Sequence, residues 1–350
     1  MELLITIIVL AFIFDYINGF HDAANAIATI VATKVLTPFQ AVLWAAFFNF
    51  VAYFISLYII GEFKIGNTIA KTVFEDYITL EVIFAGLVAA IIWNLATWKL
   101  GIPSSSSHTL IGGFMGAALV HAYTTYGIVD GVINVVKVFP IVIFIFVAPF
   151  LGLIVAYFIT VLIMFICRKT TPHKADVWFR RLQLVSSALF SMGHGANDAQ
   201  KVMGIIGAAV IFYHVQAGDT EWINAPDRFA HFVEEWWWVP LTSFIVIGLG
   251  TMSGGWKIVK TMGSKITKVN SLEGVSAETS GAITLYISEH FGIPVSTTHT
   301  ITGSIIGVGI TRRISAVRWG VTVQLVWAWI LTIPVSAFIA GITYLIISQF

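Results

Sequence analysis

The segment GIPSSSSHTLIGG, at residues 101–113, interrupts a long apolar stretch with a glycine, a proline and four consecutive serines. A second segment of the same design, GIPVSTTHTITGS, spans residues 292–304, and a shift of 191 positions superimposes the two. The matched pairs are Gly101 with Gly292, Pro103 with Pro294, Ser105 with Ser296, His108 with His299 and Thr109 with Thr300. One hydroxyl-rich break therefore lies in each half of the chain, and this duplication predicts two half-sites that face each other.

The composition around these breaks is that of a membrane protein. Hydrophobic residues make up 58% of the 350 positions and charged residues only 11%, whereas soluble domains carry about 25% charged residues. The net charge of +1 argues against a general attraction to nucleic acid. The single cysteine, Cys167, excludes an intrachain disulfide and an all-cysteine metal site. The first apolar run has no basic region before it, so we interpret it as a membrane span and not as a cleaved signal.

Apolar segments long enough to cross a bilayer as helices follow one another in both halves. In the first half they are 3–32, 38–60 and 137–168, with arms 80–100 and 110–122 on either side of the first break. In the second half they are 182–213, 236–256 and 319–347, with arms 272–289 and 301–310 around the second break. The sequence therefore predicts an all-α polytopic protein in which each half contains interrupted helices and a helical hairpin whose tip reaches the midplane.

Charged residues predict how these segments are oriented. Five Lys and Arg residues and one Asp lie at 168–181, while the loop 214–235 is acidic. Cationic side chains accumulate on the cytoplasmic side, so we expect 168–181 inside, the acidic loop outside and both termini outside. We divide the chain into a first repeat at 1–167, a short basic cytoplasmic linker at 168–181 and a second repeat of inverted topology at 182–350. Inverted repeats with interrupted helices that meet at the midplane are typical of secondary transporters.

The serine run of the first break has the chemistry of an anion site. Backbone that leaves a helix at membrane depth must be buried in protein or line a cavity, and helix N-termini bind anions through free N–H groups and the helix dipole. A cradle of hydroxyls and amides without Lys or Arg suits a small oxyanion that must also be released. The alternative is that these hydroxyls only pack or cap helices. The duplication of the pattern, in register, argues against that alternative.

A second pair of motifs, GFHDAAN at 19–25 and GANDAQK at 195–201, lies within two of the apolar segments. Asp22 matches Asp198, and His21 matches Asn197. A carboxylate at mid-membrane is costly and marks a functional site by default, yet it would repel an anion unless a cation lay between them. Carboxylate, amide and hydroxyl oxygens suit a hard cation such as Na⁺. The alternative for one such Asp is a structural pair with a nearby His or with Lys201.

Together the four motifs resemble the inorganic phosphate transporter (PiT) family of sodium- or proton-coupled phosphate symporters. That family has a GANDVAN-like motif and a GxPxSxTH-like hairpin loop in each half, which stand here as GFHDAAN, GANDAQK, GIPSSSSH and GIPVSTTH. The resemblance covers nearly the whole chain and implies phosphate as substrate, alternating access of the elevator or rocking type, and a homodimer. We expect it in the plasma (inner) membrane. The chain departs from the family at His21, where Asn is usual, and at Gln200 and Lys201, where Ala and Asn are common.

From this resemblance we assign candidate roles to residues of the four motifs and their surroundings. Phosphate is expected to bind Ser105, Ser106, Ser107, Ser296, Thr297 and Thr298. Na⁺, the only metal expected, is assigned to Asp22, Asn25, Ser104, Thr109, Asn197, Asp198 and Thr300. Supporting roles are assigned to His21, His108, Gln200, Glu278 and His299; for the two histidines that follow the breaks, a satisfied buried imidazole is an equal alternative.

The favoured function is a symporter that imports phosphate with Na⁺, without a cofactor and without enzymatic chemistry. Coupling to H⁺, or transport of a metal–phosphate complex, remains open. A passive anion channel is disfavoured, because anion pores are lined with positive charge and this site contains carboxylates. An intramembrane serine hydrolase is also disfavoured: it needs one activated serine with a base and an oxyanion hole, whereas four adjacent serines are present and no GxSxG.

Overall fold

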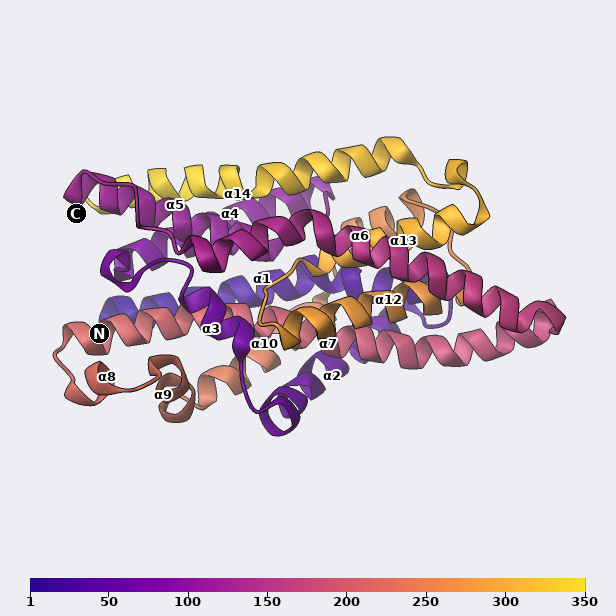
Figure 1. Ribbon diagram of the computed structural model, residues 1–350, viewed down its shortest axis with the longest axis horizontal. Coiled ribbons are helices and arrows are strands. Elements are labelled where there is room, and N and C mark those ends of the chain that lie inside the picture. Colours follow the sequence, from indigo (N-terminus) through magenta and orange to yellow (C-terminus); the bar gives the residue numbers. More distant parts are fainter. Residues whose placement is uncertain (350) are drawn as a thin grey trace.

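The computed structural model describes residues 1–349 and consists of long helices that run roughly parallel to one axis (Figure 1). Five of these helices are long and apolar enough to cross a membrane. They are Glu2–Ala32 (α1), Pro38–Ile60 (α2 and a π-helical last turn), Leu80–Leu100 (α4), Val135–Lys169 (α6 and a following turn) and Trp319–Ile347 (α14). The expectation of an all-α polytopic membrane protein is confirmed.

The other helices are more polar or shorter. They are α3 (Lys64–Ala70), α5 (Ser106–Tyr126), α7 (Pro172–Gln216), α8 (Thr220–Asn224), α9 (Arg228–Glu235), α10 (Trp238–Ser253), α11 (Trp256–Lys260), α12 (Ser271–His290) and α13 (Thr297–Arg312). The pair α9 and α10 is bent by 76°, and only together are the two helices long and apolar enough to cross a membrane. A π-helical turn, Thr261–Lys265, extends α11.

Helices α4 and α5 form one hairpin, and α12 and α13 form the other. Each turn begins with a glycine in the left-handed region, Gly101 at φ +69° and Gly292 at φ +64°, which a residue with a Cβ rarely adopts. Figure 1 shows the two hairpins entering from opposite ends of the molecule, with their tips overlapping near the middle. The tips are in contact, since the Thr298 hydroxyl donates to the Ser104 carbonyl at 3.1 Å.

Helices α1 and α7 pass through their polar motifs without a break. The apolar segment expected at 182–213 is therefore part of a longer helix, and most of the expected linker 168–181 forms the first turns of α7. A continuous helix satisfies its own backbone groups at membrane depth, so only the motif side chains need partners. Within residues 1–349, the helix breaks near the middle of the molecule lie instead at the two hairpin tips.

Glycines at matched positions let these two helices cross close neighbours. A Cβ on Gly19 of α1 would lie 2.5 Å from the Ile247 carbonyl oxygen of α10, and a Cβ on Gly195 of α7 would lie 2.6 Å from the Asn49 carbonyl oxygen of α2. Each motif helix thus packs on a helix of the other half. A side chain at either position would force the helices apart and displace the carboxylates that follow.

The two short helices α3 and α11 contact the hairpin turns in the same crossed manner. Thr68 of α3 donates its hydroxyl to the Gly292 carbonyl at 2.7 Å, and Thr261, just after α11, donates to the Gly101 carbonyl at 3.2 Å. Matched contacts of this kind support a two-fold relation between the halves. The division into inverted repeats at 1–167 and 182–350 stays a prediction.

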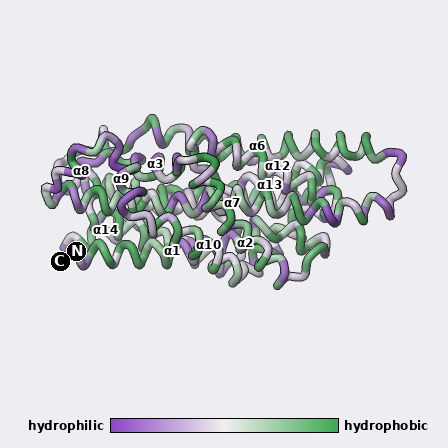
Figure 2. The backbone as a smooth tube through the Cα atoms, turned by 90° about the horizontal axis from the view of Figure 1, so that it is seen from below, coloured by the Kyte–Doolittle hydropathy of each residue, from purple (hydrophilic) through white to green (hydrophobic). Residues whose placement is uncertain are grey.

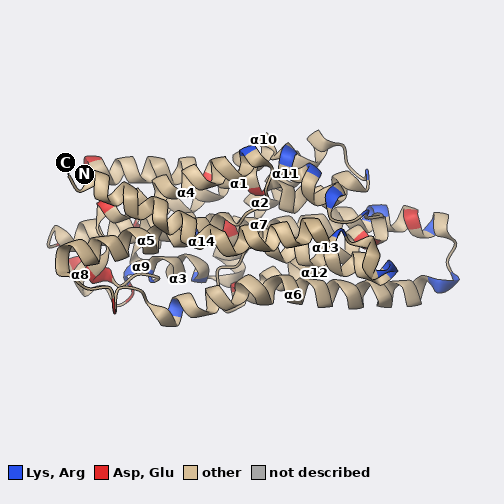
Figure 3. Cartoon of the chain, turned by 90° about the horizontal axis from the view of Figure 1, so that it is seen from above, with Lys and Arg blue, Asp and Glu red and all other residues tan. Residues whose placement is uncertain are grey.

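Hydrophobic residues dominate the long helices, and hydrophilic ones gather mostly towards the two ends of the molecule (Figure 2). Both termini lie at the end that carries α8 and α9, and the segment 168–181 lies at the opposite end (Figure 1). Lys and Arg are concentrated towards that opposite end (Figure 3). At the terminal end His214 Nδ1 lies 3.1 Å from Asp219 Oδ2, and this hydrogen bond lowers the pKa of Asp219.

Candidate functional site

The two hairpin tips and the middles of α1 and α7 meet in the interior of the molecule. The hydroxyl residues of both tips, Ser104, Ser105, Ser106, Ser107, Ser296, Thr297 and Thr298, are all at most 4% exposed. Ser105 caps α5 by accepting a hydrogen bond from the His108 N–H at 3.3 Å, and Ser296 caps α13 by accepting one from the His299 N–H at 3.2 Å. Two helix N-termini with hydroxyl-rich first turns therefore end close together, which concentrates N–H groups and positive dipole ends.

Asn25 joins α1 to the tip of the second hairpin. Its amide Nδ2 donates to the Thr297 and Thr298 hydroxyls, at 3.0 Å each. Its carbonyl oxygen is buried without a hydrogen-bond partner, as is the Ser106 hydroxyl of the opposite tip. Asn25, which the sequence analysis assigned to Na⁺, thus contacts two hydroxyls that it assigned to phosphate, and its own carbonyl oxygen remains free to accept.

The two motif carboxylates lie side by side although they come from different helices. One oxygen of Asp22, one oxygen of Asp198 and one nitrogen of His194 all lie within 4.8 Å of one another. His194 Nε2 is 3.3 Å from Asp198 Oδ2 but not in hydrogen-bond geometry. Oxygens and a nitrogen at this spacing form a buried group that has the ligand types of a small cation site.

His21 connects Asp22 to the first hairpin. Its Nδ1 lies 2.7 Å from Asp22 Oδ1, and its Nε2 lies 3.1 Å from the Thr97 hydroxyl oxygen on α4. Ser104 Oγ is 3.5 Å from the same Nε2, a Ser–His–Asp sequence of contacts, but its proton goes to Thr97 Oγ1 at 2.9 Å. The arrangement positions the hairpin and does not activate a nucleophile, which requires a hydrogen bond from the serine to the base.

Lys201, which replaces the common Asn of the second motif, reaches the first hairpin and not the surface. Its ammonium is 1% exposed and contacts Asp198 Oδ1 at 2.6 Å, the Val295 carbonyl oxygen at 2.9 Å and the Ser107 hydroxyl. All three of its donors are therefore used. The site holds a cation of its own at the junction of α7 with both tips.

Other residues expected at the site lie beside it or serve the fold. Gln200 accepts from the Ile65 N–H of α3 at 3.1 Å and donates to Glu289 at 3.2 Å. Thr109 and Thr300 donate to carbonyls of their own helices, at 2.8 Å and 3.0 Å. Both amide atoms of Asn197 are buried and unpaired. The structure brings the tips, Asp22, Asn25 and Asp198 together, while the Gln200 side chain points to α3.

His108 and His299 face each other across the two tips. Their ring centroids are 4.9 Å apart, and His299 also stacks on Trp329 of α14 at 4.1 Å. Both nitrogens of His299 and Nδ1 of His108 are buried without partners. The two imidazoles therefore pack the hairpins together just behind the hydroxyl runs.

Glu278 ties α12 to α1 and α7 at a distance from the tips. Its carboxylate accepts hydrogen bonds from Thr29 at 2.6 Å, Gln183 at 2.9 Å and Ser186 at 2.5 Å. One carboxylate oxygen of Glu278 accepts two of these hydrogen bonds and the other oxygen accepts the third. A carboxylate so fully hydrogen-bonded anchors the second hairpin to the motif helices.

Sequence reasoning gave no role to Asp15, which is fully buried with both carboxylate oxygens unpaired. The signal was present, because Asp15, Asn18, Asp22, Asn25 and Thr29 recur every three or four positions and all are buried. Such spacing places them on one face of a helix. The whole polar stripe, and not the motif alone, therefore marks the buried polar face of α1 to which Asp15 belongs.

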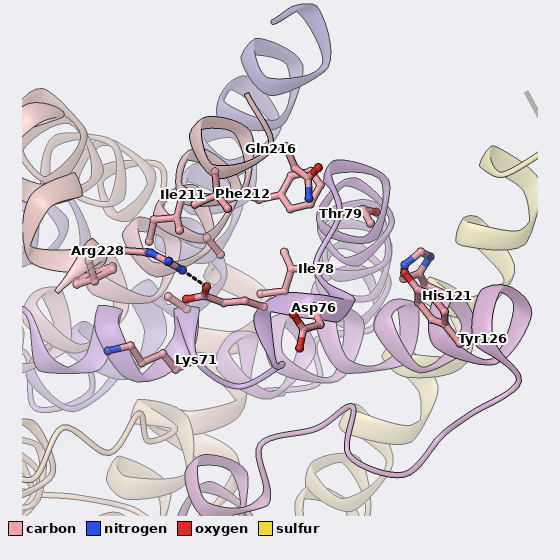
Figure 4. A pocket seen from close by; sticks show the side chains of 15 residues that line it. Lys71, Asp76, Ile78, Thr79, His121, Tyr126, Ile211, Phe212, Gln216 and Arg228 are labelled. Carbon is pink, nitrogen blue, oxygen red and sulfur yellow. Dashed lines mark hydrogen bonds and ion pairs between the residues drawn. The ribbon is translucent and has the colours of Figure 1, made fainter. Parts of the chain in front are cut away.

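A cavity of about 700 Å³ opens between α3, α5, α7 and α9, at the end that carries the termini (Figure 4). Arg228 pairs with Glu75 at its side, and Lys71 and His121 also line it. A smaller cavity of about 490 Å³ lies towards the other end, between α1 and the turn after α11, lined by Lys260 and Lys268. One cavity thus lies towards each end of the molecule, and neither is lined by residues of the tips or of the two motifs.

Comparisons with known proteins identify the relatives of this chain. The family model described as the phosphate transporter family matches residues 18–340. A probable low-affinity inorganic phosphate transporter of Rhizobium meliloti is 46% identical over 98% of this chain and 96% of its own length. One of the same description from Bacillus subtilis is 40% identical over 99% and 98%. A solved structure described as the sodium-dependent phosphate transporter matches with a TM-score of 0.81 at 25% identity and covers 100% of both chains.

Proposed function

We propose that this chain, which belongs to the phosphate transporter family, imports inorganic phosphate together with Na⁺ by alternating access. The coarser statement follows from the family itself: the protein is a multi-pass membrane transporter of phosphate and not an enzyme. The coupling ion and the mechanism are the parts that this proposal adds.

The observation that carries the proposal is that Asp22 and Asp198 lie close together and are each linked to the first tip through one side chain, Asp22 through His21 and Asp198 through Lys201. Two carboxylates in a buried site repel phosphate, and the Coulomb energy is large where the effective dielectric is low. Cations between the carboxylates and the phosphate remove this repulsion and make the binding of each depend on the other. Such mutual dependence is the thermodynamic basis of coupling.

Phosphate itself is proposed to bind at the two opposed N-termini of α5 and α13. The hydroxyls of Ser106, Ser107, Thr297 and Thr298 and the first N–H groups of both helices are suited to an oxyanion. Since Ser107 and Thr298 belong to different hairpins, a phosphate held there contacts both halves. The support for this assignment is the contact between the tips and the unpaired Ser106 hydroxyl.

Alternating access is supported by the contacts between the two tips that close the centre. Thr298 and Ser107 each bond to the backbone of the opposite tip, at 3.1 Å and 3.3 Å. Separating the tips on one side would open the site towards one end of the molecule at a time. Both termini are proposed to lie outside, because the end opposite them carries the larger share of Lys and Arg.

Na⁺ is preferred as the coupling ion because the site offers carboxylate, amide and hydroxyl oxygens, and a related transporter of known structure is described as sodium-dependent. Coupling to H⁺ is the second candidate. The specific observation in its favour is Asp15, a buried carboxyl group on the same polar stripe of α1 as Asp22, whose oxygens have no partner. A protonated carboxyl group is less costly to bury than an ionised one.

The test is phosphate uptake into proteoliposomes with Na⁺ and pH gradients imposed separately. We expect accumulation against a phosphate gradient when only Na⁺ is imposed. Accumulation driven by pH alone would replace Na⁺ with H⁺ as the coupling ion. Equilibration without accumulation under either gradient would indicate a passive channel and would refute symport.

A further inference from the structure

The Lys201 ammonium is surrounded by oxygen atoms of the motif carboxylate and of both hairpin tips. Its ammonium contacts a carboxylate (Asp198), a hydroxyl (Ser107) and a backbone carbonyl (Val295). Oxygen ligands of these three types are those that hard monovalent and divalent cations take in proteins. The Lys201 side chain is 1% exposed, so these contacts are buried away from the surface.

The equivalent position in the first motif is neutral. A shift of 176 positions places Asp22 on Asp198 and Asn25 on Lys201. Asn25 reaches the tip of the second hairpin through Thr297 and Thr298, just as Lys201 reaches Ser107 of the first. The two contacts are crossed copies of each other that differ by one positive charge.

From this asymmetry we infer that the Lys201 ammonium is a tethered cation that takes the place of one of the mobile cations of the symport cycle. Asp198 is neutralised permanently by Lys201, and the exchangeable cation binds on the side of Asp22 and Asn25. The inference rests on the proposed function, since it concerns the coupling of the same site. It changes the number of cations that accompany each phosphate.

A tethered charge cannot be released on the far side of the membrane. With Asn at position 201, Asp198 would need a mobile cation to hold phosphate nearby, and that cation would travel with it. The Lys201→Asn variant should therefore move one more positive charge per phosphate than the natural chain. One extra charge per cycle raises the steady-state accumulation about tenfold at a membrane potential of roughly 60 mV.

The experiment measures phosphate accumulation in proteoliposomes against the membrane potential, set by K⁺ and valinomycin, with equal Na⁺ and pH on both sides. For Lys201→Asn we expect phosphate accumulation to depend on the membrane potential more steeply, by one charge per phosphate. We also expect this variant to need a higher Na⁺ concentration than the natural chain for the same uptake rate, a difference that disappears when Na⁺ is saturating. Lys174→Asn, an exposed lysine on the same helix, is the matched control and should keep the natural slope. An active Lys201→Asn variant with an unchanged slope would overturn the inference.

The alternative interpretation is that Lys201 binds phosphate itself, next to the Ser107 hydroxyl that it contacts. In that case a folded Lys201→Asn variant would bind phosphate weakly at every cation concentration, and this outcome also overturns the inference. Should Lys201→Asn not yield a monodisperse protein, Asn25→Lys gives the mirror measurement. A second tethered ammonium there should make the slope shallower by one charge, and an unchanged slope would count against the inference.

Failure of the inference can be told apart from failure of the proposed function. If the natural chain is driven by pH and not by Na⁺, the proposed ion is wrong, but the change of one charge between the natural chain and Lys201→Asn is still expected. If the natural chain accumulates phosphate under neither gradient, symport itself is refuted. If symport holds and the slopes agree, only the tethered cation is refuted.

Discussion

A carboxylate oxygen of Asp22 and one of Asp198 lie within 4.8 Å of each other, although Asp22 belongs to α1 and Asp198 to α7. Their partners differ: Asp22 is 2.7 Å from a histidine, His21, and Asp198 is 2.6 Å from the Lys201 ammonium. Because only one of the two carboxylates is matched by a permanent charge, equivalent substitutions at the two positions should have different consequences.

Asp22→Asn should abolish phosphate uptake and leave a folded, membrane-inserted protein. The change removes a negative charge next to the proposed exchangeable cation, and the loss of a buried charged partner costs about 2–5 kcal/mol of binding, at least about thirtyfold. Phosphate uptake per purified molecule, in proteoliposomes, measures this loss. Asp130→Asn, on an exposed loop, is the control. Normal uptake by Asp22→Asn would contradict the assignment of Asp22.

Asp198→Asn should also lower the stability of the fold, which Asp22→Asn should not. It leaves the Lys201 ammonium buried without the carboxylate that it contacts at 2.6 Å, and an unpaired buried charge costs about 3–5 kcal/mol. The double variant Asp198→Asn/Lys201→Met should regain most of this loss, although it should not transport. The measurement is the midpoint of thermal unfolding in detergent.

An exposed ion pair provides the matched control for that experiment. Glu62 and Lys64 are 3.9 Å apart, with side chains 64% and 36% exposed. Exposed pairs contribute about 0–1 kcal/mol, so Glu62→Gln should barely move the midpoint. Equal shifts for Glu62→Gln and Asp198→Asn would mean that the pairing of Asp198 with Lys201 is not a buried structural pair.

The sequence was sufficient to predict the class of fold and to predict that the duplicated motifs lie close together. Duplicated breaks and matched Asp residues are local signals, and their proximity follows once each half contributes one copy. A pair between Asp198 and Lys201 was one of the alternatives that the sequence offered, and it is present, but the other two partners of Lys201 were not accessible in the same way. Ser107 and Val295 lie about a hundred positions away, in different hairpins, and no spacing rule connects a helix position with the far side of a hairpin turn.

The continuity of α1 and α7 could not be predicted either. A polar run in an apolar segment can break a helix or can remain helical if neighbours accept its side chains. Which outcome occurs depends on tertiary partners such as Thr97 for His21 and the two threonines for Asn25. Asp15 received no role because it lies outside the matched motif, although it continues the same buried stripe.

Glu278→Ala should destabilise the protein more than it affects phosphate binding. The substitution leaves the Thr29, Gln183 and Ser186 donors without their acceptor, and a hydrogen bond to a charged group contributes about 1.5–3 kcal/mol. We expect a clearly lower unfolding midpoint and an unchanged phosphate Kd at permissive temperature. Glu234→Ala on α9 is the exposed control. A weakened Kd at full stability would move Glu278 into the binding site.

Gly303→Ala should separate α13 from α6. A Cβ on Gly303 would lie 2.0 Å from the Pro149 carbonyl oxygen, and backbone cannot move aside as the end of a flexible side chain can. Overpacking of this kind costs about 1–3 kcal/mol. Gly320→Ala on α14, where a Cβ meets nothing within 4 Å, should instead be neutral or stabilising by up to about 1 kcal/mol, because alanine is the better helix former.

The same pair of variants tests how the second hairpin moves. If α13 and α6 travel as one body during transport, the tight contact at Gly303 persists through the cycle, and Gly303→Ala reduces stability while uptake per folded molecule is retained. If α13 slides along α6, the added methyl group meets a different part of α6 in each state, and uptake falls further than the folded fraction. Unfolding midpoints and uptake per folded molecule, measured on the same preparations with Gly320→Ala alongside, distinguish the two.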